Sequence, residues 1–204
     1  MLTIRDILCT GFRICSMRRK LLFAVPLEHG PEPAAAVPVA FRYGDAHDLD
    51  SLTAPEYAYS DDVRPFGHER LRAGDRLVLG ESSGRVVFYA WVMFGQMDLS
   101  CRNYAPLPPD SAYTYKLFTL ADCRGQRICP AYYWWIKREL RAMGYSRLLA
   151  WVEAGNDASI RAHTRAGFRR VGCIWHFRFF FRSYFITPGA EVLAPLDRQN
   201  ACAS

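Results

Sequence analysis

The stretch AYTYKLFTLADCRGQRICP, residues 112–130, joins a strand to a helix through a short loop that contains arginine and glycine. Its first half is rich in aromatic and β-branched residues, which favours a strand over 112–120. Pro130 suits the first turn of a helix and Gly144 suits the position just past its end. The sequence therefore predicts a strand, a loop and a helix from Pro130 to about Met143.

The start of this helix is a candidate anion site. The first backbone N–H groups of a helix have no partner within it, and the helix dipole adds partial positive charge there. A pyrophosphate fits such a place, and Arg124 and Arg127 would add charge-assisted hydrogen bonds. Neither GxxxxGK[ST] nor GxGxxG is present. Taken alone, the loop fits an ordinary strand-to-helix connector better than a binding site.

A second segment makes the pattern more specific. RLLAWVE (147–153) predicts another strand, and NDASIRAHTRAGF (156–168) predicts a short helix closed by Gly167. Together the two segments resemble the GNAT superfamily of acyl-CoA N-acyltransferases, element by element over 41–186 and closely over 113–172. The family's donor motif, R/Q-x-x-G-x-G/A, and its later N-x-x-A/S…G-F motif correspond to Arg124, Gly125, Gln126, Arg127, Ile128 and Cys129, and to Asn156, Ser159, His163, Gly167 and Phe168.

The resemblance implies both a fold and a donor site. The fold is α+β (mixed α/β), with a mostly antiparallel twisted sheet, a V-shaped splay between two central parallel strands, and helices on both faces. The co-substrate is acetyl-CoA or another acyl-CoA, without a metal. Its pantetheine arm would run along Leu117, Phe118 and Thr119, its pyrophosphate would lie on residues 124–129, and Asn156 and Ser159 would lie near the same arm.

Three positions depart from the family pattern. The usual glycines are Arg127 and Cys129, so the pyrophosphate loop has another shape, although its N–H donors remain. The position where many members place a thiolate-protonating tyrosine holds His163. Cys129 adjoins a helix N-terminus, which is expected to lower its pKa. Direct acyl transfer needs no covalent cysteine, so we interpret Cys129 as structural.

The candidate catalytic residues are Glu153, His163 and Tyr115. Glu153 ends its strand and is the first candidate for a general base, although a carboxylate there could equally cap the next turn. His163 titrates near neutrality and could protonate the thiolate, but a packed or merely exposed helical histidine fits the pattern too. Tyr115 could donate a proton, yet an aromatic-rich chain also needs core tyrosines.

The acceptor pocket is expected from residues 54–72 and the final hairpin. Acidic side chains there could attract a cationic amine, while aromatic and histidine side chains shape the wall, or the acidic run is a solvated loop face. The relevant residues are Glu56, Asp61 and Asp62, and Tyr57, Tyr59 and His68. The sequence is similar to acyltransferases of polysaccharide gene clusters around RICPAYY and ASIRAHTRAGF, which implies an amino sugar or its nucleotide derivative as the acceptor.

Composition narrows the class of protein. The 204 residues suffice for one core, and half of them are hydrophobic. The seven cysteines are odd in number and form no CxxC pair, which indicates a reducing, cytoplasmic compartment. No stretch reaches the roughly 18 apolar residues of a membrane helix. LLFAVPL, after the basic triplet 18–20, mimics a signal sequence but ends at Glu28, so it is interpreted as a core strand.

The rest of the chain predicts one domain with extensions. A helix is expected over 1–16, a linker over 29–38, a hairpin with a Ser-Ser-Gly turn over 76–95, and two strands over 169–186. We divide the chain into an extension (1–40), the acyltransferase domain (41–187) and a tail (188–204).

Three functions are compatible with these features. The first is acyl transfer to a primary amine of a small molecule. The second is a CoA-binding module without catalysis, and the third is a nucleic-acid-binding protein, suggested by the net charge of +6. Dispersed basic residues and the lack of a nucleic-acid motif disfavour the third. A homodimer is also compatible with the sequence.

Overall fold

The computed structural model describes residues 15–28, 36–52, 57, 63–100, 103–179 and 182–187. Within these residues, eight strands form one sheet in the order β10-β9-β1-β8-β7-β4-β3-β2, and two form a separate hairpin, β5-β6. The strands of the large sheet are β1 (Cys15–Pro26), β2 (Ala40–Gly44), β3 (Arg76–Ser82), β4 (Arg85–Phe94), β7 (Ser111–Thr119), β8 (Arg147–Glu153), β9 (Arg169–Phe179) and β10 (Arg182–Ile186). The hairpin joins β5 (Gln96–Ser100) to β6 (Asn103–Pro106).

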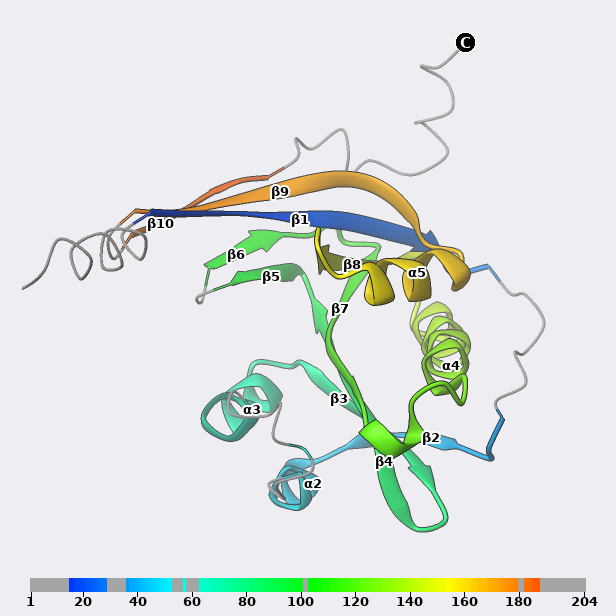
Figure 1. Cartoon of the computed structure of the whole chain (residues 1–204). Coiled ribbons are helices and arrows are strands. Elements are labelled where there is room, and N and C mark those ends of the chain that lie inside the picture. Colours follow the sequence, from blue (N-terminus) through cyan, green and yellow to red (C-terminus); the bar gives the residue numbers. More distant parts are fainter. Residues whose placement is uncertain are drawn as a thin grey trace, which may run out of the picture.

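The sheet is mostly antiparallel and has helices on both sides. Among the described residues, only β7 and β8 pair in parallel. Figure 1 shows α4 (Ile128–Ala142) and α5 (Asp157–Arg165) on one side of the bent sheet, with α2 (Ala46–Ser51), α3 (Val63–Arg72) and the β5–β6 hairpin on the other. The predicted α+β class and the pair of central parallel strands are confirmed.

Local sequence explains several of these elements. Ser83 and Gly84 have φ values of 50° and 75°, so they form the two-residue turn that joins β3 to β4. The Asp45 carboxylate accepts hydrogen bonds from the N–H groups of His47 and Asp48 and so caps α2. Pro130 lies in the first turn of α4, which begins two residues earlier than expected, at Ile128.

The first strand lies inside the sheet. β1 pairs antiparallel with β8 on one edge and with β9 on the other. The predicted core strand LLFAVPL is confirmed, with Leu22 fully buried. The predicted extension covers residues 1–40, and within it β1 supplies an interior strand of the sheet. The helix predicted over 1–16 lies mostly outside the described residues, and its last two residues begin β1.

The β5–β6 hairpin lies between the predicted hairpin over 76–95 and the predicted strand over 112–120, where the sequence predicts no strand. Its strands are short, and Pro106 ends β6. Two buried apolar side chains of β5, Met97 and Leu99, anchor it. Because this hairpin contacts both β4 and β7, it covers one side of the sheet beside the parallel strands. In the described part of the chain, no helix combines the length and the apolar character that crossing a membrane requires.

Candidate active site

β7 and β8 part after a short stretch of pairing. The parallel pairs run from Ser111 with Arg147 to Tyr113 with Leu149, and none follows. β7 stays paired with β4 as far as Thr119, while β8 stays paired with β1 as far as Glu153. The facing edges of residues 114–119 and 150–153 therefore have no strand partner among the described residues. We call this region the splay.

A bulge in β7 accounts for the parting. Tyr89 is paired with Phe118 and Trp91 with Tyr115, so one residue of β4 faces two of β7. Lys116, inside the bulge, has a φ of 50°, a left-handed conformation that is rare for a residue with a side chain. A bulge bends its strand and increases the local twist, which turns β7 away from β8. The predicted V-shaped splay is thus present.

Polar side chains close the paired end of the two strands. The buried Arg147 donates from Nε to the Ser111 hydroxyl at 2.6 Å and lies 3.6 Å from the Asp110 carboxylate. The Ser146 hydroxyl donates to the same carboxylate, and the Ser146 N–H donates to the Asp110 carbonyl at 2.9 Å. These bonds hold the strands together at one end, so the splay opens only toward their carboxyl ends.

The entrance of α4 lies at the open end. Arg127 occupies the N-cap with a φ of 60° and makes no side-chain cap hydrogen bond, and Gly125 also has a positive φ of 80°. For residues 125–129 the structure gives no hydrogen bond donated by a backbone N–H to any described residue. Arg124, Gly125 and Arg127 are exposed. The helix entrance is therefore open, with two arginines beside it, which suits a pyrophosphate.

Two contacts shape the loop before α4. Arg124 donates from Nε to the Thr119 carbonyl at 3.2 Å, which ties the loop to the end of β7. The Ala36 N–H donates to the Gln126 carbonyl at 3.0 Å, so the segment before β2 supports the loop from outside. A Cβ added at Gly125 would meet no atom within 4 Å, so its positive φ, not crowding, calls for glycine.

Asn156 and Ser159 begin α5. The Asn156 side chain accepts a hydrogen bond from the Ser159 N–H at 3.1 Å and caps the helix. This contact explains why asparagine suits the position. Their predicted contact with the pantetheine arm stays a prediction.

His163 lies in the layer between the sheet and the helices. Its Nδ1 is 2.7 Å from the Ser159 carbonyl, and its Nε2 is 2.8 Å from the Tyr133 hydroxyl. A carbonyl only accepts, so Nδ1 carries the proton and Nε2 accepts from Tyr133. Burial lowers the pKa of His163, and the rings of Phe23 and Phe168 pack around it. His163 is therefore a neutral imidazole with both nitrogens satisfied.

The expected lowering of the Cys129 pKa was wrong. Burial raises the pKa of this thiol to about 12, and a hydrogen bond with Tyr133 offsets only part of the rise. Although Cys129 lies in the first turn of α4, its side chain is partly buried, and desolvation of the thiolate outweighs the helix dipole. The interpretation of Cys129 as structural fits this environment.

A polar cluster lies on the other side of the sheet and joins segments that no sequence motif connects. The Tyr115 hydroxyl donates to the buried Asp75 carboxylate at 2.6 Å. The Arg70 guanidinium lies 3.7 Å from Asp75 and 3.9 Å from Asp98. Burial raises the pKa of Asp75 and also that of Tyr115. We call Arg70, Asp75, Asp98 and Tyr115 the Asp75 cluster; it brings together α3, the start of β3, β5 and β7.

The β5–β6 hairpin is attached to both parting strands. The Asp98 carbonyl accepts from Trp151 Nε1 of β8 at 2.6 Å and from the Tyr113 hydroxyl of β7 at 3.4 Å. Buried Lys20 donates from Nζ to the Leu99 carbonyl at 2.6 Å and lies over the Trp151 ring. The hairpin therefore spans the splay on the side opposite α4.

Glu153 ends β8 at the open end of the splay. Its Cα partner on β1 is Lys20, and its charge raises the pKa of His176 on β9 against the larger effect of burial. Glu153 and Tyr115 thus lie on different strands of the splay, while His163 lies on the helix side. The three predicted catalytic residues are not in mutual contact in any hydrogen bond of the described residues.

The predicted acceptor residues are only partly described. Glu56, Tyr59, Asp61 and Asp62 lie outside the described residues. Tyr57 is buried and donates its hydroxyl to the Val86 carbonyl at 2.6 Å, and His68 is exposed on α3. The final hairpin, β9–β10, is separated from β8 by β1. The hairpin beside the splay is instead β5–β6.

A groove of about 1000 Å³ lies elsewhere, on the outer side of α4. Trp134, Trp135 and Arg138 of α4 line it together with residues 36–41 and 81–83, and no predicted site residue does. In the described residues, no group of three or more His, Cys, Asp or Glu side chains is arranged to hold a metal ion.

The comparisons with known proteins agree with this geometry. The model of the acetyltransferase (GNAT) family matches residues 43–168, which is more than half of the chain. The chain belongs to the GNAT family of acetyltransferases. The matched range includes the splay, the entrance of α4 and α5, but not β1. No curated protein matches this GNAT sequence.

Solved structures share the GNAT fold. A GCN5-related N-acetyltransferase from Kribbella flavida has a TM-score of 0.54 at 19% identity, over 90% of this chain and 63% of that one. A GNAT-family protein from Novosphingobium aromaticivorans has a TM-score of 0.51 at 17% identity, over 78% and 63%. AAC(6')-Iy, solved with the bisubstrate analogue CoA-S-monomethyl-acetylneamine, has a TM-score of 0.52 at 14% identity, over 65% and 92%. This GNAT chain spans less than two thirds of the length of the first two.

Proposed function

We propose that this protein transfers an acetyl or other short acyl group from acyl-CoA to a primary amine of a small molecule. The observation that carries the proposal is the splay, whose open end meets an uncapped helix entrance. A thioester arm needs an unpaired strand edge to lie against, and a pyrophosphate needs exposed N–H groups. Both lie next to each other along residues 114–129.

The donor would lie along this path. The edge of Leu117, Phe118 and Thr119 would hydrogen-bond the pantetheine arm as an added strand does. The pyrophosphate would bind at residues 124–129, with Arg124 and Arg127 adding charge-assisted bonds. Asn156 and Ser159, at the first turn of α5, would lie on the opposite side of the arm.

The reaction joins the amine nitrogen to the thioester carbonyl carbon. The C–N bond forms, the C–S bond breaks, one proton leaves the nitrogen and one reaches the thiolate. Much of the acceleration would come from holding the two reactants in line across the splay. Glu153 is the proposed base that takes the amine proton, directly or through water. Tyr115 is the proposed proton donor to the thiolate; His163, the other predicted donor, serves only if its Nδ1–H leaves the Ser159 carbonyl.

The acceptor would approach from the side of the β5–β6 hairpin. The carboxylates of Asp75 and Asp98 lie there, with one guanidinium, Arg70, between them. These two carboxylates would orient a cationic amine. An amino sugar, free or linked to a nucleotide, is the acceptor we propose to test first.

The test combines binding and turnover. Purified protein is mixed with acetyl-CoA and a panel of primary amines, and release of the CoA thiol is followed. We expect amine-dependent release that Arg124→Gln weakens through the KM for acetyl-CoA, and that Glu153→Gln weakens through kcat with a changed pH profile. Arg141→Gln, an exposed charge at the end of α4, is the matched control. Absence of any thermal stabilisation by acetyl-CoA would refute the donor site.

A CoA-binding module without catalysis is the second candidate. It is favoured by His163, whose two nitrogens are already paired with Ser159 and Tyr133. Under this alternative, acetyl-CoA raises the melting temperature but no amine releases CoA. Turnover of one amine that His163→Gln leaves unchanged would support the enzyme and remove His163 from the proton path.

A further inference from the structure

β1, β9 and β10 extend beyond β8 as a three-stranded arm. β8 pairs with β1 only from Lys20 onward, whereas residues 15–19 of β1 pair only with β9. We define the arm as residues 15–19, 175–179 and 182–187. β10 forms the edge of the whole sheet. Figure 1 shows this part of β1 and β9 projecting past α5.

One side of the arm is apolar and aromatic. The pairing places Met17, Phe177 and Tyr184 in one cross-strand row, and Arg19, Trp175 and Ile186 in the next row on the same side. Four apolar side chains of this side are more than half exposed, namely Met17 (62%), Phe179 (54%), Tyr184 (52%) and Ile186 (59%). A contiguous exposed apolar surface of this kind usually marks a binding face.

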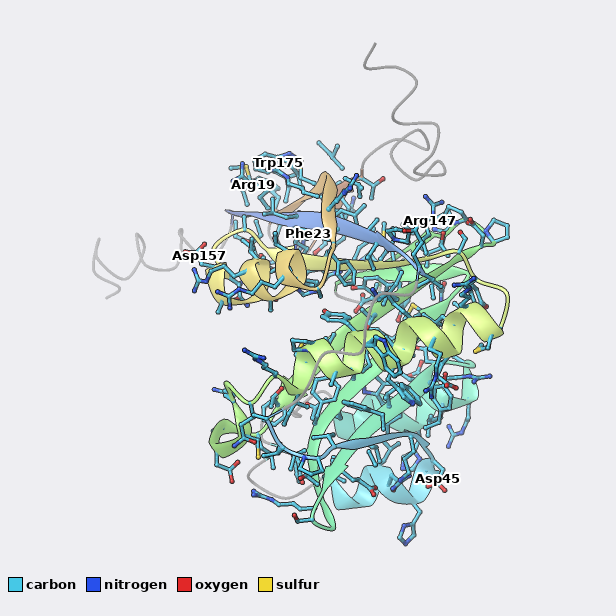
Figure 2. The ribbon with its side chains drawn as sticks, turned by 90° about the vertical axis from the view of Figure 1, so that its right-hand side faces the viewer. Arg19, Phe23, Asp45, Arg147, Asp157 and Trp175 are labelled. Carbon is cyan, nitrogen blue, oxygen red and sulfur yellow. The ribbon has the colours of Figure 1, made fainter. Side chains whose placement is uncertain are left out.

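The same arm is strongly basic. Arg18, Arg19, Arg178 and Arg182 are all exposed; the register places Arg19 and Arg182 on the apolar side and Arg18 and Arg178 on the opposite side. No aspartate or glutamate occurs in the described residues of the arm. The Arg19 guanidinium lies over the Trp175 ring, 5.6 Å from its centroid, and Figure 2 shows the two side chains together on the outer side of β1. After burial, the charges of Lys20 and Arg18 further lower the pKa of His176, which reflects this positive field.

The positive charge of the arm indicates which partner binds it. A second copy docking arm to arm would bring arginines against arginines, with no carboxylate in the described arm to pair with them. A lipid bilayer with anionic headgroups matches both the apolar side chains and the arginines of the arm. The apolar side chains can enter the acyl-chain region while the arginines reach the phosphates. Tryptophan and tyrosine also favour the boundary between lipid and water. We propose that the arm docks this protein peripherally onto an anionic lipid surface.

Aliphatic side chains favour lipid over nucleic acid as the partner. Stacking on bases uses aromatic faces, whereas Met17 and Ile186, the two most exposed large hydrophobic residues of the described chain, offer none. In the sheet, β8 lies between the arm and β7, the strand that leads to the loop before α4. Lipid binding therefore does not depend on the proposed acyl transfer and is measured without it.

The test is co-flotation of the full chain with vesicles. One set contains phosphatidylcholine alone, and the other contains about 30 mol % phosphatidylglycerol, at low and high salt. We expect binding to the anionic set that falls with salt. Arg19→Gln/Arg182→Gln should weaken it by roughly 25-fold, from about five-fold per arginine. Arg141→Gln/Arg169→Gln removes the same charge outside the arm and should bind as the wild type does.

An apolar variant tests insertion separately. Met17→Thr/Ile186→Thr keeps strand-forming residues at exposed positions and should weaken binding on the order of 100-fold, while Met143→Thr, an exposed apolar residue after α4, should not. Circular dichroism checks folding, and the arginine pair carries the test if the apolar variant does not fold. The proposal is overturned by equal binding to neutral vesicles, by no binding, by a dimer that Met17→Thr/Ile186→Thr dissolves, or by anionic binding that only RNA or DNA reproduces.

Discussion

Removing the Tyr133 hydroxyl tests how His163 is held. In Tyr133→Phe the ring remains, so its contacts with the His163 and Phe168 rings, at centroid distances of 5.5 and 4.8 Å, are kept. What is lost is the 2.8 Å hydrogen bond to His163 Nε2, together with the hydroxyl's hydrogen bond to the Cys129 thiol. Both residues are buried, with Tyr133 1% and His163 6% exposed, so water cannot replace the hydroxyl.

The expected cost follows from the tautomer. The proton on His163 Nδ1 stays hydrogen-bonded to the Ser159 carbonyl in the variant. Nε2 therefore becomes a buried acceptor without a partner. Such a group costs about 1–3 kcal/mol. For a chain of this size each kcal/mol lowers the melting temperature by about 2–4 °C, so a loss of about 2 kcal/mol predicts a fall of about 4–8 °C.

Urea denaturation followed by tryptophan fluorescence measures this cost. The free energy of unfolding should fall with an unchanged m-value. Tyr184→Phe, which removes a hydroxyl from an exposed strand, is the control and should stay within about 0.5 kcal/mol of the wild type. The double variant Tyr133→Phe/His163→Leu should recover part of the loss, because it leaves no unpaired nitrogen. A Tyr133→Phe protein as stable as Tyr184→Phe would refute the pairing.

Three further predictions concern neighbouring residues. The folded-state pKa of His163 is lowered, so the stability that its neutral form contributes is present above about pH 6.5 and is lost as the pH falls toward the folded pKa. Between about pH 7.5 and 5, the melting temperature should therefore fall less steeply in His163→Leu than in the wild type. Arg127→Gly should raise the free energy of unfolding by about 0.5–1 kcal/mol, because glycine adopts the positive φ of 60° without steric strain. Calorimetry of the same variant should show weaker binding of acetyl-CoA. A less stable variant would contradict backbone strain at Arg127. Because its pKa is raised to about 12, Cys129 should not react with iodoacetamide at neutral pH in the folded protein but should react in urea, and peptide mass spectrometry measures both. Rapid labelling of the folded protein would contradict the raised pKa and support a pKa lowered by the helix dipole.

Local patterns in the sequence were sufficient for most elements. The turn at Ser83 and Gly84, the helix that begins around Pro130 and the short helix closed by Gly167 each follow from neighbouring residues, because turn chemistry and helix periodicity act over a few positions. The family motifs located the loop before α4 and the start of α5. The core strand LLFAVPL was also recognised, but its partners were not.

Tertiary structure alone decided how these elements meet. The position of β1 between β8 and β9, the bond from Lys20 to Leu99, 79 residues apart, and the Asp75 cluster join segments that no local pattern connects. The same holds for the pKa values: the sequence places Cys129 at a helix start, which lowers a thiol pKa, and only packing shows that burial raises it. Strand pairing and desolvation depend on neighbours brought together by the whole chain, and this is why residue order predicted the parts of the site but not their environment.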